Sequence, residues 1–199
     1  HRRYSMPDFP LLVNFYGGPG CGKSSMALGV TSICKWRGIE AEYVPEVPKD
    51  LVYEENWNVL ENQLKVLGDQ WQRIHRLVKH RKIIVTDSPI IIQTLYNKKY
   101  IPEFNAMVTA LHNTFPSLNY LLTRKKEYDP AGRYQTEEQA KDLDVVALNR
   151  LMQFKIPYTV IDGIEANAEV IYQHILAYMR EVEDKHVKAV ASSYSLKQS

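Results

Sequence analysis

The segment Gly17-Gly18-Pro19-Gly20-Cys21-Gly22-Lys23-Ser24 matches the phosphate-binding loop pattern G-x-x-x-x-G-K-[ST] at every position. Glycines allow such a backbone to curl, so that successive N–H groups point inward at phosphate oxygens. We expect this loop and the adjacent Ser25 to bind a nucleoside triphosphate, with Lys23 at the β- and γ-phosphates and the Ser24 hydroxyl on Mg²⁺. The segment therefore predicts ATP, or GTP by the same contacts, and Mg²⁺ as cofactors.

The residues on either side of this loop predict a strand before it and a helix after it. Residues 11–16 are mostly apolar and lead directly into the glycines, and Met26, Val30 and Ile33 follow at helical spacing. Strand, glycine loop and helix form the context in which the pattern binds phosphate, because the positive end of the helix dipole then faces the anion.

Apolar strand-like segments alternate with amphipathic helical segments along the rest of the chain. The sequence predicts strands at 40–44, 82–87, 119–123 and 158–162, and helices at 57–80, 102–115, from about 136, and 166–183. Such alternation is typical of a parallel sheet with helices on both faces. We therefore expect an α/β fold with three layers, α/β/α, around a five-stranded parallel sheet.

The composition fits one globular domain. A chain of 199 residues with 45% hydrophobic residues suits a single core, which we expect in residues 6–184, with 1–5 as a flexible or added start and 185–199 as a polar tail. Cys21 and Cys34 are expected to be reduced thiols, which favours the cytoplasm. No segment approaches the length of a membrane span. The net charge of +2 neither requires nor excludes a nucleic-acid partner.

Polar residues that follow the predicted strands are the candidate site, because ligands of such sheets bind beyond the carboxyl ends of the strands. Asp87 ends the strand at 82–87 and is expected to hold Mg²⁺; the same side chain also suits an N-cap of the next helix. Glu46 follows the strand at 40–44 and has prolines near it that restrict the backbone. We expect Glu46 to be the general base toward an acceptor hydroxyl, with a solvated loop glutamate as the alternative.

A polar segment with a proline and a glycine runs from Arg124 to Arg133, after the strand at 119–123, and is expected to form a lid loop. Phosphoryl transfer spreads negative charge over the phosphate oxygens, and closing arginines stabilise that charge. We expect Arg124 and Arg133 to play this part.

Candidate acceptor-binding residues lie on the helix predicted at 57–80 and just before it. Three polar residues share one face of that helix: Gln63, Gln70 and Arg73. A glutamine amide can pair with the edge of a nucleobase, and Tyr53 is a candidate to stack on a base, whereas Trp71 is assigned to the core. Residues 73–82 form a basic run, which is either a solvated helix end or a nucleic-acid contact.

Four stretches besides the loop are similar to segments of a known group. They are Glu42-Tyr43-Val44-Pro45-Glu46, Lys49-Asp50-Leu51-Val52-Tyr53-Glu54, Val85-Thr86-Asp87-Ser88-Pro89 and Gly132-Arg133-Tyr134-Gln135-Thr136-Glu137-Glu138-Gln139-Ala140. With the loop, they resemble a family of bacteriophage P-loop kinases, within the nucleoside and nucleotide kinases, that includes enzymes proposed to phosphorylate 5-hydroxymethyluracil in DNA. The resemblance covers about residues 11–180 and implies a kinase-like fold in which Glu46 is the base and Asp87 completes the metal site.

The sequence departs from this group at one point. In deoxynucleoside kinases an arginine often follows the aspartate closely, whereas Ser88 and Pro89 stand here, which shifts arginine catalysis to Arg124 and Arg133. We expect a Mg²⁺- and ATP-dependent kinase acting on 5-hydroxymethyluracil in DNA, in the host cytoplasm if a phage encodes it. The alternatives are a soluble deoxynucleoside or nucleoside monophosphate kinase, and an NTP-hydrolysing switch.

Overall fold

The computed structural model describes residues 9–96, 102–125 and 136–195. Its centre is a five-stranded, all-parallel sheet, as the sequence predicts, and the strand order is β2-β3-β1-β4-β5. The strands are β1 (Leu11–Tyr16), β2 (Ala41–Val44), β3 (Ile83–Thr86), β4 (Ser117–Thr123) and β5 (Thr159–Asp162). The middle strand, β1, is buried along its whole length, so the loop that follows it starts from the core of the sheet.

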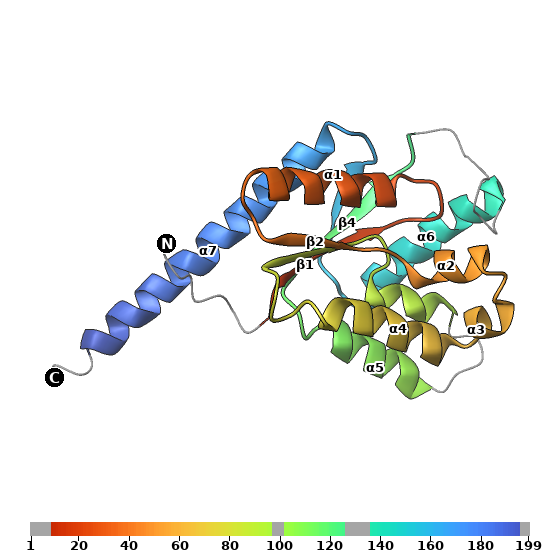
Figure 1. The fold of residues 1–199 in the computed structure, drawn as a ribbon, viewed down its shortest axis with the longest axis horizontal. Coiled ribbons are helices and arrows are strands. Elements are labelled where there is room, and N and C mark those ends of the chain that lie inside the picture. Colours follow the sequence, from red (N-terminus) through yellow and green to blue (C-terminus); the bar gives the residue numbers. More distant parts are fainter. Residues whose placement is uncertain (1–8, 97–101, 126–135, 196–199) are drawn as a thin grey trace.

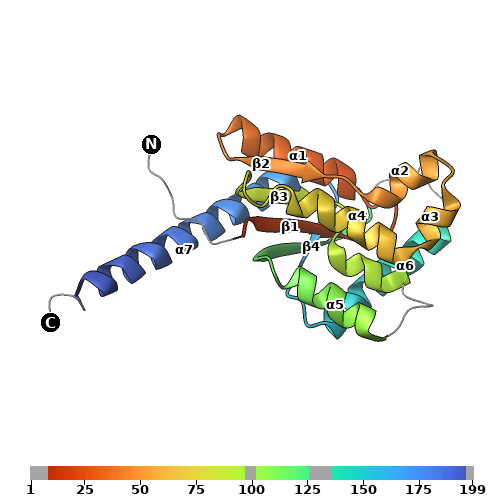
Figure 2. The ribbon, with the colours of Figure 1, turned by 60° about the horizontal axis from the view of Figure 1, so that its bottom comes forward.

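Helices cover both faces of the sheet and form the outer two of three layers (Figures 1 and 2). They are α1 (Lys23–Trp36), α2 (Val47–Tyr53), α3 (Trp57–Glu61), α4 (Gln63–His75), α5 (Pro102–His112), α6 (Glu137–Gln153) and α7 (Asn167–Ser195), with a 3-10 helix η1 (Ile90–Tyr96). Successive residues of β1 point to opposite faces. Phe15 packs with α1 and α7, whereas Tyr16 packs with α4, α5 and α6, so each face of the sheet has its own core.

The short helices α2 and α3 follow β2 and are held by a third, smaller cluster. Val47, Leu51 and Val66 join α2 to α4, and Val59 and Leu60 of α3 pack against them. A small cluster of this kind buries much less apolar surface than the two main cores. We therefore expect α2 and α3 to be the elements that separate most easily from the sheet.

The structure divides the helix predicted at 57–80. At Asn62 the backbone leaves helical angles, with ψ of 88°, and the Asn62 side chain caps α4 by accepting the Lys65 N–H. Because α4 ends at His75, most of the basic run at 73–82 lies beyond the helix, in the turns and loop before β3. The segment after Glu46, for which no helix was predicted, forms α2; Pro48 lies in the first turn of this helix, where a missing N–H costs nothing.

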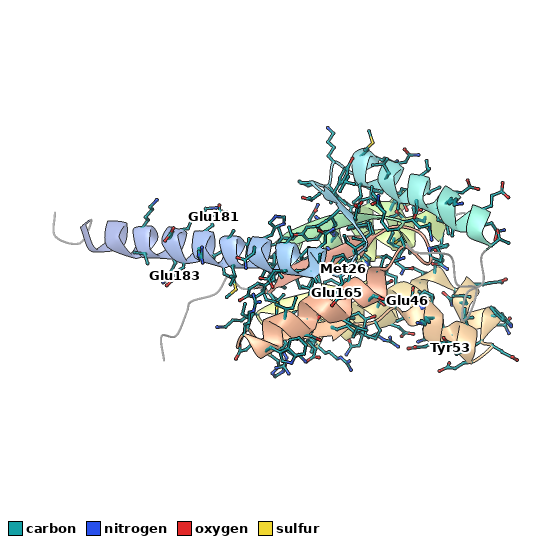
Figure 3. All side chains as sticks on the ribbon, turned by 90° about the horizontal axis from the view of Figure 1, so that it is seen from above. Met26, Glu46, Tyr53, Glu165, Glu181 and Glu183 are labelled. Carbon is teal, nitrogen blue, oxygen red and sulfur yellow. The ribbon has the colours of Figure 1, made fainter. Side chains whose placement is uncertain are left out.

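Helix α7 is longer than predicted and continues to Ser195, through the segment expected to be a polar tail. Its polar residues reflect exposure to solvent along an extended helix, and Lys185 pairs with Glu181 one turn away at 2.7 Å. Figure 1 shows this end of α7 projecting away from the sheet, and Figure 3 marks Glu181 and Glu183 on it. Within the ranges that the structure describes, no helix is long and apolar enough to cross a bilayer.

Candidate active site

The phosphate-binding loop connects β1 to α1 at the carboxyl end of the sheet. Gly22 is the N-cap of α1 and has φ of 98° and ψ of 10°, a left-handed conformation that glycine adopts without steric cost. No acidic residue lies in the first turn of α1. Ser25 is exposed in that turn, whereas Cys21, within the loop, is buried. The free N–H groups and positive dipole end of α1 thus suit the binding of an anion.

The outer side of the loop is held by α6 and by the residue that follows β4. The N–H of Gly18 donates to Asp144 Oδ1, and a Cβ at Gly18 would lie 2.0 Å from the Ala140 carbonyl oxygen. Asp144 Oδ2 also accepts from Arg124 Nη2 at 3.0 Å, and Arg124 Nη1 donates to the Pro19 carbonyl at 2.7 Å. Asp144 and Arg124 therefore fix the position of the loop from outside the phosphate-binding face.

Arg124 and Arg133 are the two arginines expected to contact the transferred phosphoryl group. Arg124 has a side chain that is only 11% exposed, and both of its Nη atoms are bound to protein acceptors. It braces the loop in this structure, and its contact with phosphoryl oxygens stays a prediction. Arg133 and the rest of the lid loop at 126–135 lie outside the described residues. Asp144 was missed because nothing in its own helix distinguishes it; its partner Gly18 lies 126 positions away.

Lys23 places its ammonium group over the loop. Its Nζ donates to the carbonyl oxygens of Gly17 at 2.8 Å and Gly18 at 2.9 Å. These bonds keep the positive charge of Lys23 at the turn where the sequence predicts the β- and γ-phosphates.

Asp87 lies beside Ser24, as expected of two ligands of one Mg²⁺. The Ser24 hydroxyl donates to Asp87 Oδ2 at 2.5 Å, and the Tyr43 hydroxyl donates to the same oxygen at 2.8 Å. Burial raises the pKa of Tyr43, and the negative charge of Asp87 raises it further. Tyr43 was missed in the sequence because its hydroxyl meets Asp87 only across neighbouring strands, β2 and β3.

The second carboxylate oxygen of Asp87 supports the metal assignment. Asp87 is 3% exposed, and its Oδ1 is buried without a hydrogen-bond partner in the described part of the chain. A buried carboxylate oxygen without a partner is costly unless a ligand binds it, and a hydroxyl and a carboxylate are ligands that Mg²⁺ prefers. No cluster of three or more His, Cys, Asp or Glu side chains suited to a metal occurs among the described residues. Ser24 and Asp87 would therefore hold Mg²⁺ together with phosphate oxygens and water, and no N-cap bond from Asp87 to η1 is found.

Glu46 lies at the carboxyl end of β2, next to the loop. It occupies the N-cap position of α2, but its side chain makes no capping hydrogen bond, so the carboxylate remains available. Burial raises the pKa of Glu46; the positive charge of Lys23 opposes this shift and the negative charge of Asp87 adds to it. Figure 3 shows Glu46 near the beginning of α1. A half-buried carboxylate with a raised pKa, facing both the loop lysine and the metal-site aspartate, has the properties of a general base.

Tyr96, at the end of η1, lies close enough to Glu46 for the two side chains to interact electrostatically. The pKa of Tyr96 is raised by burial and then by the negative charge of Glu46. The short run of isoleucines after Asp87 has the pattern of a core segment, so the sequence does not indicate that η1 borders the site.

The four residues predicted to bind the acceptor differ in their burial and in their distance from Glu46 along the fold. Gln70 is fully buried, and its Oε1 accepts the Val47 N–H at 3.1 Å, directly beside Glu46. Gln63 Nε2 donates to the Leu60 carbonyl, and Tyr53 is 65% exposed at the far end of α2 from Glu46 (Figure 3). Arg73 Nη1 donates to the Pro45 carbonyl at 3.3 Å, so of the four residues Gln70 and Arg73 each contact a backbone neighbour of Glu46.

The last of these residues, Arg73, belongs to the basic run. It pairs with Asp50 at 2.6 Å and so ties α4 to α2. Arg81 pairs with Glu42 at 3.2 Å. Trp71 packs edge-on against Phe115, in agreement with its assignment to the core. Part of the charge in the basic run therefore stabilises the fold, and nucleic-acid contact by the rest stays a prediction.

Comparison with known proteins agrees with this geometry at the level of the family. The profile of a family described as an AAA domain matches residues 12–167, which include the phosphate-binding loop, Glu46, Asp87 and the five strands almost entirely. A search of curated proteins returns no match to this sequence. Because the profile covers most of the chain and contains the whole site, the chain belongs to the AAA domain family and is an α/β P-loop nucleotide-binding domain.

Proposed function

We propose that this protein is an ATP- and Mg²⁺-dependent phosphotransferase that moves the γ-phosphoryl group to a hydroxyl acceptor. The observation that carries the proposal is the position of Glu46, whose carboxylate is not used for capping and interacts with both Lys23 and Asp87. A phosphate acceptor is already ionised, whereas an alcohol benefits from a carboxylate that takes its proton. A half-buried base next to the phosphate-binding loop therefore favours an alcohol as the acceptor.

In this reaction the acceptor oxygen forms a bond to the γ-phosphorus, and the bond from that phosphorus to the β–γ bridging oxygen breaks. Glu46 takes the proton of the acceptor hydroxyl, and ADP leaves. Lys23 and the N–H groups of the loop stabilise the negative charge on the phosphate oxygens. When bound by Ser24 and Asp87, Mg²⁺ supplies further neutralisation of that charge. Arg124 keeps the loop in position through the Pro19 carbonyl, and Arg133 is assigned to the closing lid.

The acceptor that we propose is the 5-hydroxymethyl group of a modified uracil in DNA. The four stretches that resemble phage P-loop kinases support it, since they contain Glu46, Asp87 and Arg133. Extruding a base from a duplex costs a few kcal/mol, and this cost is avoided when the strand is already single. A soluble deoxynucleoside, served by the same base and loop, remains an alternative acceptor, as does a nucleoside monophosphate, whose ionised phosphate would use the loop without the base.

ATP hydrolysis is the second candidate function, and the family description as an AAA domain favours it. The same Glu46 carboxylate that deprotonates an alcohol would also polarise a water molecule. The two functions are separated by following the γ-phosphoryl group from labelled ATP in the presence of single-stranded DNA with 5-hydroxymethyluracil, the free nucleoside, nucleoside monophosphates or no acceptor. Acceptor-dependent turnover with label in the acceptor supports the phosphotransferase. Release of free phosphate at the same rate with and without every acceptor supports hydrolysis and contradicts the proposal.

A further inference from the structure

The second half of α7 extends beyond the domain. Ile171 and Ile175 are buried in the core between α7 and the sheet, and Met179 packs against that core. Of the residues that follow, none up to Lys188 belongs to an apolar cluster of the described chain, although the helix continues to residue 195. About 24 Å of helix therefore projects from the domain (Figures 1 and 2). Since most of the stability of a protein helix comes from packing of one face, this segment calls for a partner.

The face of α7 that packs on the sheet continues through the projecting segment. Residues at spacings of three and four share one side of a helix. From Met179 onward the residues on this side are Val182, Glu183, His186 and Val187, which together form the α7 stripe. The two valines are the only apolar residues between 180 and 188, and Val187 is 60% exposed. The stripe is thus a short apolar surface with one acidic and one imidazole group at its centre.

The opposite side of the projecting segment is a solvated face. Lys185 Nζ pairs with Glu181 at 2.7 Å, and both side chains are exposed. Figure 3 shows Glu181 and Glu183 on opposite sides of the helix. Within the described residues, neither Glu183 nor His186 has a hydrogen bond or an ion pair with the rest of the chain. The charges on the outer side are therefore paired within one helix, whereas the polar groups of the α7 stripe are available to another molecule.

The order of residues in the α7 stripe is complementary to itself when it is reversed. In two antiparallel copies that cross between residues 184 and 185, Val182 faces Val187 of the second copy, and Glu183 faces its His186. The valines then cover each other, and an imidazole N–H donates to a carboxylate. Two-fold symmetry makes each of these contacts occur twice. In a parallel pair the two Glu183 carboxylates would face each other instead, which is unfavourable.

We propose that α7 is a self-association element, through which two copies of this chain pair in antiparallel orientation along the α7 stripe. A second copy is the partner that fits, because the stripe supplies both members of every contact. Helix α7 begins beside the phosphate-binding loop, where a Cβ at Gly163 would lie 2.3 Å from the Cys21 carbonyl oxygen. From there it runs to the opposite end of the domain (Figure 1). Pairing of the projecting segments therefore leaves the candidate active sites of both copies accessible.

The contact is small, which sets the affinity that we expect. The projecting segments overlap over about three helical turns, and this overlap buries less than the roughly 1,200 Å² that is typical of stable complexes. We therefore expect a weak, reversible dimer that forms at about 100 µM protein and dissociates at about 1 µM.

Sedimentation velocity over this concentration range tests the proposal, with Glu183→Lys and Glu181→Lys as matched variants. Both reverse the same charge on the same helix, but only Glu183 belongs to the α7 stripe. We expect Glu183→Lys to weaken the dimer by at least about tenfold, because a lysine then faces the imidazole, and Glu181→Lys to have a dissociation constant close to that of the wild type. Circular dichroism shows whether the helix content is kept in each variant.

A double variant that exchanges the two polar residues, Glu183→His with His186→Glu, separates pairing from a loss of helix. In antiparallel copies the exchange restores a carboxylate opposite an imidazole, so the dimer should return to within about threefold of the wild-type affinity. His186→Glu alone places two carboxylates opposite each other and should weaken the dimer as Glu183→Lys does. Failure of the exchange to restore association would contradict the assigned contact.

Cysteine cross-linking determines the orientation. Cys21 and Cys34 are buried, so Val182→Cys and Val187→Cys each introduce one accessible thiol. When the two variants are mixed at about 100 µM and oxidised, with a tag on one of them, an antiparallel pair joins one variant to the other, and a parallel pair joins each variant to itself. We expect the mixed product. A wild type that stays monomeric, a dimer unaffected by Glu183→Lys, or cross-linking of each variant to itself overturns the inference. Because no nucleotide is used, these outcomes are independent of the proposed reaction.

Discussion

The carboxylate of Asp144 on α6 accepts hydrogen bonds from the Gly18 N–H and from the Arg124 guanidinium, 3.0 Å away, and so connects α6 to the phosphate-binding loop. Helix α6 begins at Glu137, with Thr136 and Gln139 forming a capping box immediately after the lid segment. The helix that follows the lid is therefore bonded to the loop that we expect to hold the phosphates. A displacement of α6 would move the Gly18 backbone directly.

Asp144→Asn tests this connection. The amide keeps the shape of the side chain but removes the charge that strengthens both hydrogen bonds. We expect the KM for ATP to rise by about tenfold, since a hydrogen bond to a charged group contributes about 1.5–3 kcal/mol. Steady-state kinetics with Asp142→Asn, an exposed aspartate on the same helix, is the control. Equal kinetics for the two variants would show that Asp144 does not position the loop.

Gly18→Ala tests the close approach of the loop to α6. The new Cβ would meet the Ala140 carbonyl at 2.0 Å, so the loop must shift, at a cost of about 1–3 kcal/mol in the free energy of unfolding and with weaker nucleotide binding. Gly29→Ala on α1 is the matched control. Its new Cβ would lie 3.5 Å from the Cβ of Ala168 on α7, which is an ordinary van der Waals contact. That control should be stabilised by up to about 1 kcal/mol. Urea unfolding of both variants distinguishes the loop contact from a general intolerance of alanine.

Glu46→Gln tests the general base. We expect kcat to fall by about 10²–10⁴-fold with little change in ATP affinity, because a base acts in the chemical step. Glu54→Gln, on an exposed glutamate at the end of α2, is the control. Unchanged turnover in Glu46→Gln would show that another group takes the proton.

The pH dependence of the wild type follows from the raised pKa of Glu46. The base acts when deprotonated, so kcat falls as the pH drops through a pKa that lies above the ordinary value of 4.5, and Glu46→Gln lacks this acid limb. The folded protein retains the Glu46 proton to higher pH than the unfolded chain, so stability falls as the pH rises through this pKa. Glu46→Gln should therefore have a higher Tm than the wild type at neutral pH. A Tm at neutral pH that is lower in the variant would contradict the assigned direction of the shift.

Asp87→Asn tests the metal site, with Tyr43→Phe as its partner variant. Removing the carboxylate should abolish the dependence of ATP affinity on Mg²⁺ and weaken Mg²⁺ binding by more than about 100-fold, beyond the range for residues that only support a ligand. Tyr43→Phe keeps the carboxylate and removes one hydrogen bond of 2.8 Å, so its affinity for Mg²⁺ should fall by about tenfold or less. ATP titrations with and without Mg²⁺ check both. A persistent Mg²⁺ dependence in Asp87→Asn would place the metal elsewhere.

The parts of the site that the sequence predicts are those specified by local patterns. Ser24 and Asp87 each follow a buried strand, and in a parallel sheet the carboxyl ends of strands meet at one edge, so their contact could be anticipated. The placement of Glu46 next to the loop follows from the same rule. The five strands were found because their apolar runs are bounded by turn residues.

The remaining parts depend on contacts between distant segments. Tyr43 and Asp144 lie in ordinary strand or helix sequence, and their contacts with the site come only from the segments that pack against them. The break at Asn62 was missed because apolar spacing continues through it on both sides. Local periodicity indicates which face of a helix or strand is buried. It does not indicate which polar side chain from a distant segment lies against that face.

The central claim is that the loop at residues 17–24, with Asp87, holds a magnesium nucleotide. Calorimetric titration of Mg²⁺·ATP into the wild type and into Lys23→Ala tests it most directly, with circular dichroism to show that both proteins are folded. We predict Mg²⁺-dependent binding to the wild type and a loss of at least about tenfold in the variant, because Lys23 supplies a charged contact to the phosphates. Equal affinity of the two folded proteins, or no binding of Mg²⁺·ATP to the wild type, would contradict the account.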